Sequence, residues 1–158
     1  MDFIIRPALK SDYEALCEII DEIDALHRNA LPSIYKKPDG PVREKDYINS
    51  IISDKDQRVL VAMHEGRIVG FINAVIIASK DFPIVKKRKY VKLDTVVVKE
   101  EFQRSGIGTR LMEGIHDWAR EKGMNQIELA VWSFNTSAIS FYNKLGYKTA
   151  QQRLWKIL

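Results

Sequence analysis

Two glycines separated by one residue, Gly106 and Gly108, follow a β-branched run and stand at the start of a segment with helical apolar spacing. Glycines at such a turn let a ligand approach the main chain closely. The first amides of the following helix would lack intrahelical partners and carry partial positive charge. Arg104 could add a charge-assisted contact to phosphate oxygens. Residues 103–109 are therefore predicted to bind a pyrophosphate.

The glycine pair by itself is not specific, because glycines also simply terminate strands. Other phosphate-binding loops fit less well. No Gly-Lys-Ser/Thr follows, so the loop is not of the Walker type, and the third glycine of a dinucleotide fingerprint is missing. A GTP- or ATP-binding protein is disfavoured because no phosphate-binding lysine or Mg²⁺ carboxylate follows the loop.

Changes in apolar periodicity and turn residues define the elements that must position this loop. Ser11 with Glu14 predicts a capping box for the first helix, and Gly123 predicts the end of the helix that starts at 107. The order is β-α-α-β-β-β-α-β-α-β: one α/β (α+β) domain over 1–158, with a mixed sheet and helices on both faces. The predicted strands are 3–6, 57–63, 67–78, 89–98, 127–132 and 147–158, and the predicted helices are 11–27, 43–53, 107–122 and 135–145.

Composition narrows the classes of function. The net charge of +4 suits an anionic ligand, whereas the basic run 86–89 has the character of a solvated loop, so no nucleic-acid partner is expected. Cys17 is the only cysteine, and the histidines show no ligand spacing, so neither a disulfide nor a metal site is expected. No apolar run is long enough to span a bilayer and no signal peptide is evident; a cytoplasmic protein without membrane contact is expected.

Four segments carry a resemblance to a known family. Residues 103–108 resemble the Q/R-x-x-G-x-G/A acyl-CoA loop of the GNAT N-acetyltransferases, and 93–98 resemble the strand before that loop. Residues 135–147 look like the N-x-x-A-x-x-F-Y-x-K-x-G-F/Y segment of the same family. The opening 5–8, followed by Asp12, is also similar. The resemblance touches nearly the whole chain.

The resemblance implies acetyl-CoA as co-substrate, no metal, and a primary amine of a small molecule or peptide as acceptor. It also implies a possible homodimer. The strands 89–98 and 127–132 would splay apart and hold the pantetheine arm between them. The cofactor-binding residues implied in this way are Val96, Val97, Val98, Gln103, Arg104, Ser105, Gly106, Ile107, Gly108, Thr109, Asn135 and Tyr142. Asn135 has a second interpretation as a helix N-cap, and both roles can hold at once.

The implied reaction is attack of an amine on a thioester. The resemblance places Tyr142 near the sulfur, where its hydroxyl can stabilise the leaving thiolate. A phenol near pKa 10 is a weaker acid than a thiol near 8.5, so hydrogen bonding alone can suffice. The structural alternative is an aromatic ring packed with Phe141 and Leu145.

The amine must also lose a proton to a base. Some members place a glutamate twelve residues before the tyrosine, but Ala130 stands there. Glu128 and Asp94 are the remaining candidates, and either could instead be a solvated or ion-paired strand residue.

A non-catalytic acyl-CoA-binding regulatory module is the alternative function. Candidate residues for the acceptor side are His27, Tyr35, Asp39, Asp46 and Tyr47.

Overall fold

The computed structural model describes residues 2–158 and contains one mixed sheet with the strand order β1-β2-β3-β4-β5. The pairs β1–β2, β2–β3 and β3–β4 are antiparallel, and β5 is parallel to β4. The strands are β1 (Ile4–Pro7), β2 (Gln57–His64), β3 (Arg67–Ala78), β4 (Lys89–Val98) and β5 (Ile127–Leu129). The helices are α1 (Tyr13–Ala30), α2 (Lys45–Ser53), α3 (Ile107–Glu121) and α4 (Thr136–Lys144), with short 3₁₀ turns η1 (Lys10–Asp12) and η2 (Glu100–Phe102).

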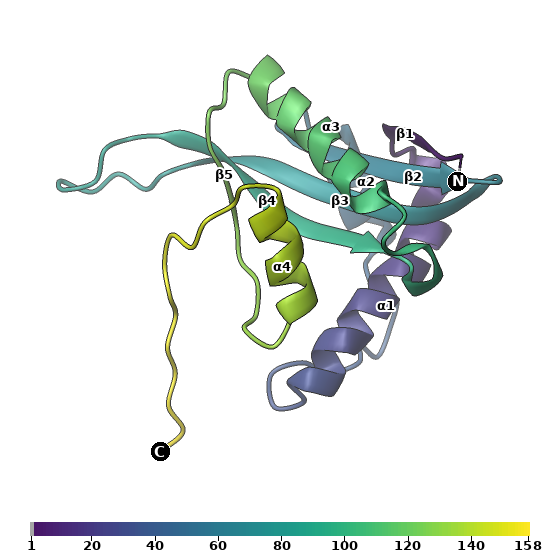
Figure 1. The fold of residues 1–158 in the computed structure, drawn as a ribbon, viewed down its shortest axis with the longest axis horizontal. Helices are drawn as coiled ribbons and strands as arrows, with labels where there is room; N and C mark the ends of the chain where they lie inside the picture. Colours follow the sequence, from purple (N-terminus) through teal and green to yellow (C-terminus); the bar gives the residue numbers. More distant parts are fainter. Residues whose placement is uncertain (1) are drawn as a thin grey trace.

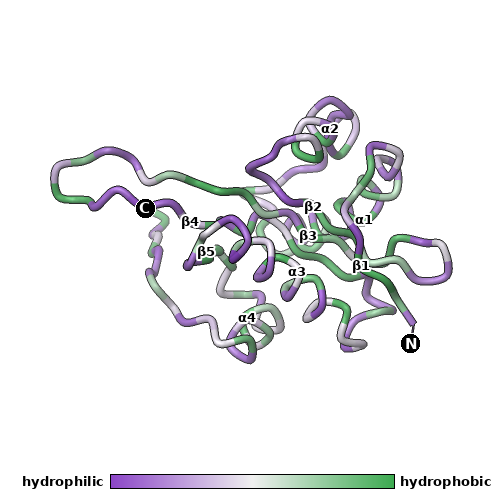
Figure 2. The backbone as a smooth tube through the Cα atoms, turned by 90° about the horizontal axis from the view of Figure 1, so that it is seen from above, coloured by the Kyte–Doolittle hydropathy of each residue, from purple (hydrophilic) through white to green (hydrophobic). Residues whose placement is uncertain are grey.

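Helices cover both faces of the sheet, which confirms the predicted layers. Figure 2 shows α1 and α2 on one side and α3 and α4 on the other. Alternate residues of the central strands supply two cores. Val61 and Phe71 pack with Ile19 of α1, whereas Ile72 packs with Leu111 of α3. Full burial of each such side chain contributes about 1.5–3 kcal/mol, so the two helical layers hold the sheet rigidly between them.

The predicted capping box at Ser11 is wrong. Ser11 lies inside η1, and α1 begins only at Tyr13. The Asp12 carboxylate accepts a hydrogen bond from the Leu9 amide at 2.7 Å and two from the Arg6 guanidinium at 2.7 and 2.9 Å. The start of α1 is therefore fixed by an ion pair to β1, which the local pattern of residues could not reveal. The predicted helix end is confirmed: Gly123 has a φ of +72°.

The predicted final strand over 147–158 is also wrong. Residues 148–158 form no strand, and Figure 1 shows this segment running away from the sheet. Leu154 and Ile157 are 88% and 85% exposed. Their types favour an extended chain, but a strand also needs a neighbouring ladder, and this segment has none within the described residues. β5 is likewise shorter than predicted. It ends at Leu129.

Within residues 2–158, no helix combines the length and the apolar character that crossing a bilayer would require.

Candidate active site

The sheet opens between β4 and β5. Only three residue pairs join these strands, and the last is Leu93 with Leu129. Beyond this point β4 continues to Val98 while remaining paired with β3, and the chain after β5 follows another course. The side of β4 that faces away from β3 therefore presents main-chain groups that no strand satisfies. This is the splay that the resemblance implied.

A groove of about 1540 Å³ runs along this opening. One wall comes from β4 and the loop before α3, another from the chain after β5 and from α4, and a third from α1 and α2. Most of the residues predicted to bind the cofactor line it: Val96, Val97, Val98, Gln103, Arg104, Gly106, Gly108, Thr109, Asn135 and Tyr142. Two others do not. The Ile107 side chain is buried in the core, and the Ser105 hydroxyl donates to the Phe102 carbonyl.

The loop before α3 has the backbone of an anion site. Arg104 and Gly106 both have positive φ, +60° and +90°, which turns the chain sharply into α3. No side chain caps the helix, so its first amides are free to bind a ligand. The side-chain amide nitrogen of Gln103 donates to the Val98 carbonyl at 3.1 Å, which links the loop to the end of β4.

The two glycines serve different purposes. Gly106 needs its φ of +90°, which is costly for any residue with a Cβ, and a Cβ there would have open space around it. At Gly108 a Cβ would lie 3.3 Å from the Phe141 ring. The sequence suggested that both glycines admit a ligand. The second one also admits α4, because it lets that helix approach α3 closely.

Tyr142 is 9% exposed and lies on α4, with its ring 5.4 Å from Phe141 and 5.8 Å from Tyr147. Burial raises the pKa of Tyr142 to about 12, and Tyr147 adds to the rise. The ring thus packs as the structural alternative suggested, yet the residue also lines the groove. Its hydroxyl therefore remains protonated at neutral pH and can donate a hydrogen bond to a developing anion.

Asn135 is the N-cap of α4, as predicted. Its side-chain oxygen accepts from the Ala138 amide at 3.1 Å. The side-chain nitrogen of Asn135 is not used by this cap, so the same residue can still donate to a ligand carbonyl in the groove.

The two candidate bases lie in different surroundings. Asp94 lines the groove and forms an ion pair with Lys92 at 2.7 Å. Glu128 does not line the groove, because it lies in the paired part of β5 opposite Lys92. Its carboxylate is held by Arg88 at 2.7 Å. Ala130, the position at which some family members have a glutamate, lines the groove.

On the acceptor side, His27 and Tyr47 line the groove as expected, but Tyr35, Asp39 and Asp46 do not. Tyr35 lies against His27, with ring centroids 5.4 Å apart, and accepts a hydrogen bond at 2.9 Å from Trp132, across 97 residues of sequence. This bridge ties the loop after α1 to the chain after β5. No short-range pattern could have predicted it.

Among the groove residues that the sequence did not single out, the most unusual is an asparagine within a strand. Asn73 of β3 is 5% exposed, and its side-chain oxygen has no hydrogen-bond partner among the described residues. The signal was present, since Asn73 is the one amide side chain within the apolar run from Ile68 to Ala78.

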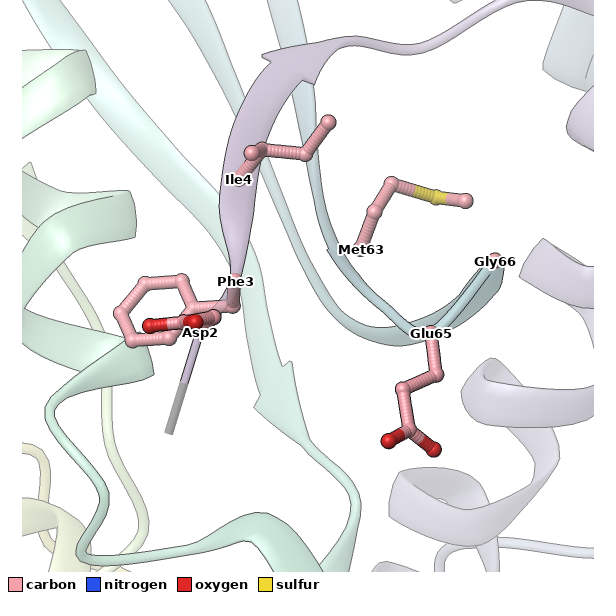
Figure 3. Close-up of a pocket in the computed structure, with 6 residues that line it drawn as sticks. All are labelled: Asp2, Phe3, Ile4, Met63, Glu65 and Gly66. Carbon is pink, nitrogen blue, oxygen red and sulfur yellow. The ribbon is translucent and has the colours of Figure 1, made fainter.

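A second, smaller hollow of about 410 Å³ lies beside β1 and the turn between β2 and β3 (Figure 3). Its two carboxylates, on Asp2 and Glu65, do not converge on a common point. We therefore assign the chemistry to the larger groove.

Fold and groove together define a class of protein: an α/β domain in which an opened strand pair leads directly into a helix N-terminus suited to a phosphorylated ligand. Residues 20–147 match the Acetyltransferase (GNAT) family. The chain belongs to the GNAT acetyltransferase family.

Individual relatives agree with this assignment. Human N-acetyltransferase 8 is 26% identical over 107 residues, which cover 68% of this chain and 45% of the human protein. The chain spans less than two thirds of the length of the first curated relatives that it matches. A variant of the Bacillus halodurans BH1408 protein with four substitutions has the same fold, with a TM-score of 0.91 and 24% identity over 98% of this chain and 99% of that one. The aminoglycoside N-acetyltransferase AAC(6')-Iy in complex with CoA has a TM-score of 0.74 and 16% identity, over 98% of each chain.

Proposed function

We propose that the protein transfers an acetyl group from acetyl-CoA to a primary amine of a small molecule or peptide, by direct attack in a ternary complex. One observation carries the proposal. A single groove contains the free edge of β4, the uncapped N-terminus of α3 and the buried hydroxyl-bearing ring of Tyr142.

Each part of coenzyme A has a counterpart along this groove. The pyrophosphate would lie on the amides of residues 104–109, where the helix dipole and the Arg104 charge favour an anion. The pantetheine arm carries amides that would pair with the free main chain around Val96 and Val98. Asn135 would donate to it from the other wall. A structural neighbour that binds CoA in the same fold supports this cofactor.

Tyr142 would stabilise the departing thiolate by hydrogen bonding. With a pKa of about 12, the phenol is a weaker acid than an ordinary thiol by roughly 3.5 units. Complete proton transfer to sulfur is therefore unfavourable, whereas a hydrogen bond to developing negative charge is strengthened by the low dielectric around the buried ring.

Of the two carboxylates considered as the base, Asp94 is the better candidate because it lines the groove. It would accept the amine proton directly or through one water molecule, after release from Lys92. Glu128 would first have to leave Arg88, and it would act only from outside the groove.

The test is a pair of measurements on the purified protein. Calorimetry with acetyl-CoA should show binding in the micromolar range, and a thiol-release assay across a panel of primary amines should show turnover with at least one of them. The variant Tyr142→Phe should bind the cofactor normally and lose most of the turnover.

Two outcomes would count against the proposal. Binding of acetyl-CoA without turnover of any amine would favour the alternative, an acyl-CoA-binding regulatory module. Absence of binding by folded protein would remove both functions.

A further inference from the structure

We propose that the side-chain amide of Asn73 binds the acceptor amine, and that the acceptor is a primary amine carried on an extended apolar arm. This inference rests on the proposed function and specifies the substrate side of the same groove.

Asn73 lies on β3, next to the position at which β4 and β5 stop pairing. On β3 it pairs with Thr95, whereas the next residue, Ala74, pairs with Leu93. Asp94 is therefore an extra residue in β4, a bulge opposite Asn73. Pairing with β5 ends at Leu93, one residue before this bulge. The bulge changes the course of β4 at the position where β4 and β5 stop pairing. Asn73 lies next to this bulge and lines the groove.

The polarity of the unpartnered atom restricts what it can bind. A buried amide oxygen without a partner costs free energy, and proteins retain such groups at binding sites. The Asn73 oxygen only accepts hydrogen bonds, so its partner must bring an N–H or O–H group. The thioester carbonyl and sulfur bring none. The pantetheine amides would pair with the free edge of β4, as proposed above. The attacking amine brings N–H groups to the required place.

Carboxylates on this side of the groove supply further acceptors. Glu22, Asp24 and Asp94 all line it. Each is held in an ion pair, Asp24 with Arg43, Asp94 with Lys92 and Glu22 with Lys99. An amine entering beside Asn73 would therefore meet hydrogen-bond acceptors whose charge is already balanced.

The groove wall behind these carboxylates is apolar. Ile20, Ile23 and Phe71 supply it from α1 and β3. Such a surface gains free energy from contact with methylene groups and gives no partner to the hydroxyl groups of a sugar. An alkyl amine fits this surface better than an amine on a polyhydroxylated ring.

The experiment compares two probe amines, hexylamine and glucosamine, with wild-type protein and with Asn73→Leu. Wild type should acetylate hexylamine with a kcat/KM about tenfold or more above that for glucosamine. Asn73→Leu should lower kcat/KM for hexylamine about tenfold or more while the KM for acetyl-CoA stays within about twofold. Its Tm should be unchanged or higher, because the substitution removes an unsatisfied buried amide.

A structural role would lower the Tm and leave the preference between amines intact, and that result would overturn the inference. Failure of wild type to acetylate hexylamine while it binds acetyl-CoA and acetylates glucosamine would overturn it as well, with the proposed function intact. Loss of acetyl-CoA binding by wild type would instead overturn the proposed function. Should Asn73→Leu not fold, Asn73→Ala gives the same comparison without added bulk, and an unchanged kcat/KM for hexylamine in that variant contradicts the inference.

Discussion

The two halves of β4 do opposite things. From Lys89 to Leu93 the strand is paired with β3 on one side, and its last three residues pair with β5 on the other, with Val91 and Leu93 buried in the core. From Thr95 to Val98, beyond the bulge at Asp94, it is paired with β3 alone, and the other edge faces the groove. The first half closes a sheet. The second half offers unpaired main chain to a ligand.

This difference shows how one strand can serve both stability and binding. Unpaired main-chain groups in a buried sheet would be costly, so they are tolerated only where water or a ligand can satisfy them. The bulge at Asp94 marks the change between the halves. Substitutions in the open half and in the parts that face it should alter function, whereas matched substitutions elsewhere should alter stability at most.

The largest effect is expected at Tyr142, which faces the open half from α4. Tyr142→Phe should lower kcat about 100-fold, because the ring that fills the core remains and only the proposed donor to the thiolate is lost. The Kd for acetyl-CoA by calorimetry should change less than about threefold. Tyr147→Phe is the matched control, since its hydroxyl bonds to His116 at 2.9 Å outside the groove lining. Equal losses in both variants would contradict the assignment.

The next largest effect is expected from comparing two carboxylates, one in the open half of β4 and one in the paired strand β5. Asp94→Asn should lower kcat/KM about tenfold or more at pH 7, because the carboxylate in the groove is the proposed proton acceptor. Glu128→Gln, in the paired region, loses only a partly exposed ion pair to Arg88, which is typically worth about 1 kcal/mol or less. Its activity should match that of wild type. If Glu128→Gln instead lost more activity than Asp94→Asn in steady-state assays, Glu128 would be assigned as the base.

A smaller effect is expected where the open half leads into α3. Gly106→Ala forces a Cβ into a left-handed conformation with a φ of +90°, which costs about 1–2 kcal/mol and disturbs the amides proposed to bind the pyrophosphate. Affinity for coenzyme A should fall about tenfold. Gly123→Ala imposes a similar strain, at a φ of +72°, at the far end of the same helix. It should lose comparable stability in thermal melts yet retain its affinity for coenzyme A; weakened binding by both would indicate a global effect.

The smallest effect concerns alkaline pH. Because the folded pKa of Tyr142, about 12, lies above its ordinary value of 10.0, the stabilising contribution of the protonated phenol is complete below pH 10 and is lost as pH rises toward 12. Two units correspond to about 2.7 kcal/mol. Denaturant midpoints between pH 9 and 12 should therefore fall more steeply for wild type than for Tyr142→Phe. Parallel curves would mean that the hydroxyl is solvated.

Local patterns predicted most of the fold because the signals that they use are themselves local. The bounds 67–78 and 89–98 agree with the observed strands, and Asn135 caps α4 as expected. The start of α1 was missed because it depends on an ion pair between Arg6 and Asp12. The strand over 147–158 was overpredicted because residue types report extended chain, not a ladder partner.

The candidate site divides in the same way. The phosphate loop and Tyr142 lie in motifs that the resemblance covers, so their places in the groove could be anticipated. The choice between Asp94 and Glu128 could not, because it depends on where β4 and β5 part. The Tyr35–Trp132 bridge depends on a contact between distant segments. Asn73 was visible as the one amide side chain in an apolar run, but its place beside the end of the β4–β5 pairing was not.

Amide hydrogen exchange with and without acetyl-CoA would show whether the cofactor occupies the open half of β4. We expect binding to slow exchange at residues 104–109 and at the amides of 94–98 that do not bond to β3, while 89–93 stay unchanged. Protection centred on the turn between β2 and β3, or none in 94–109 when the ligand is bound, would contradict this expectation.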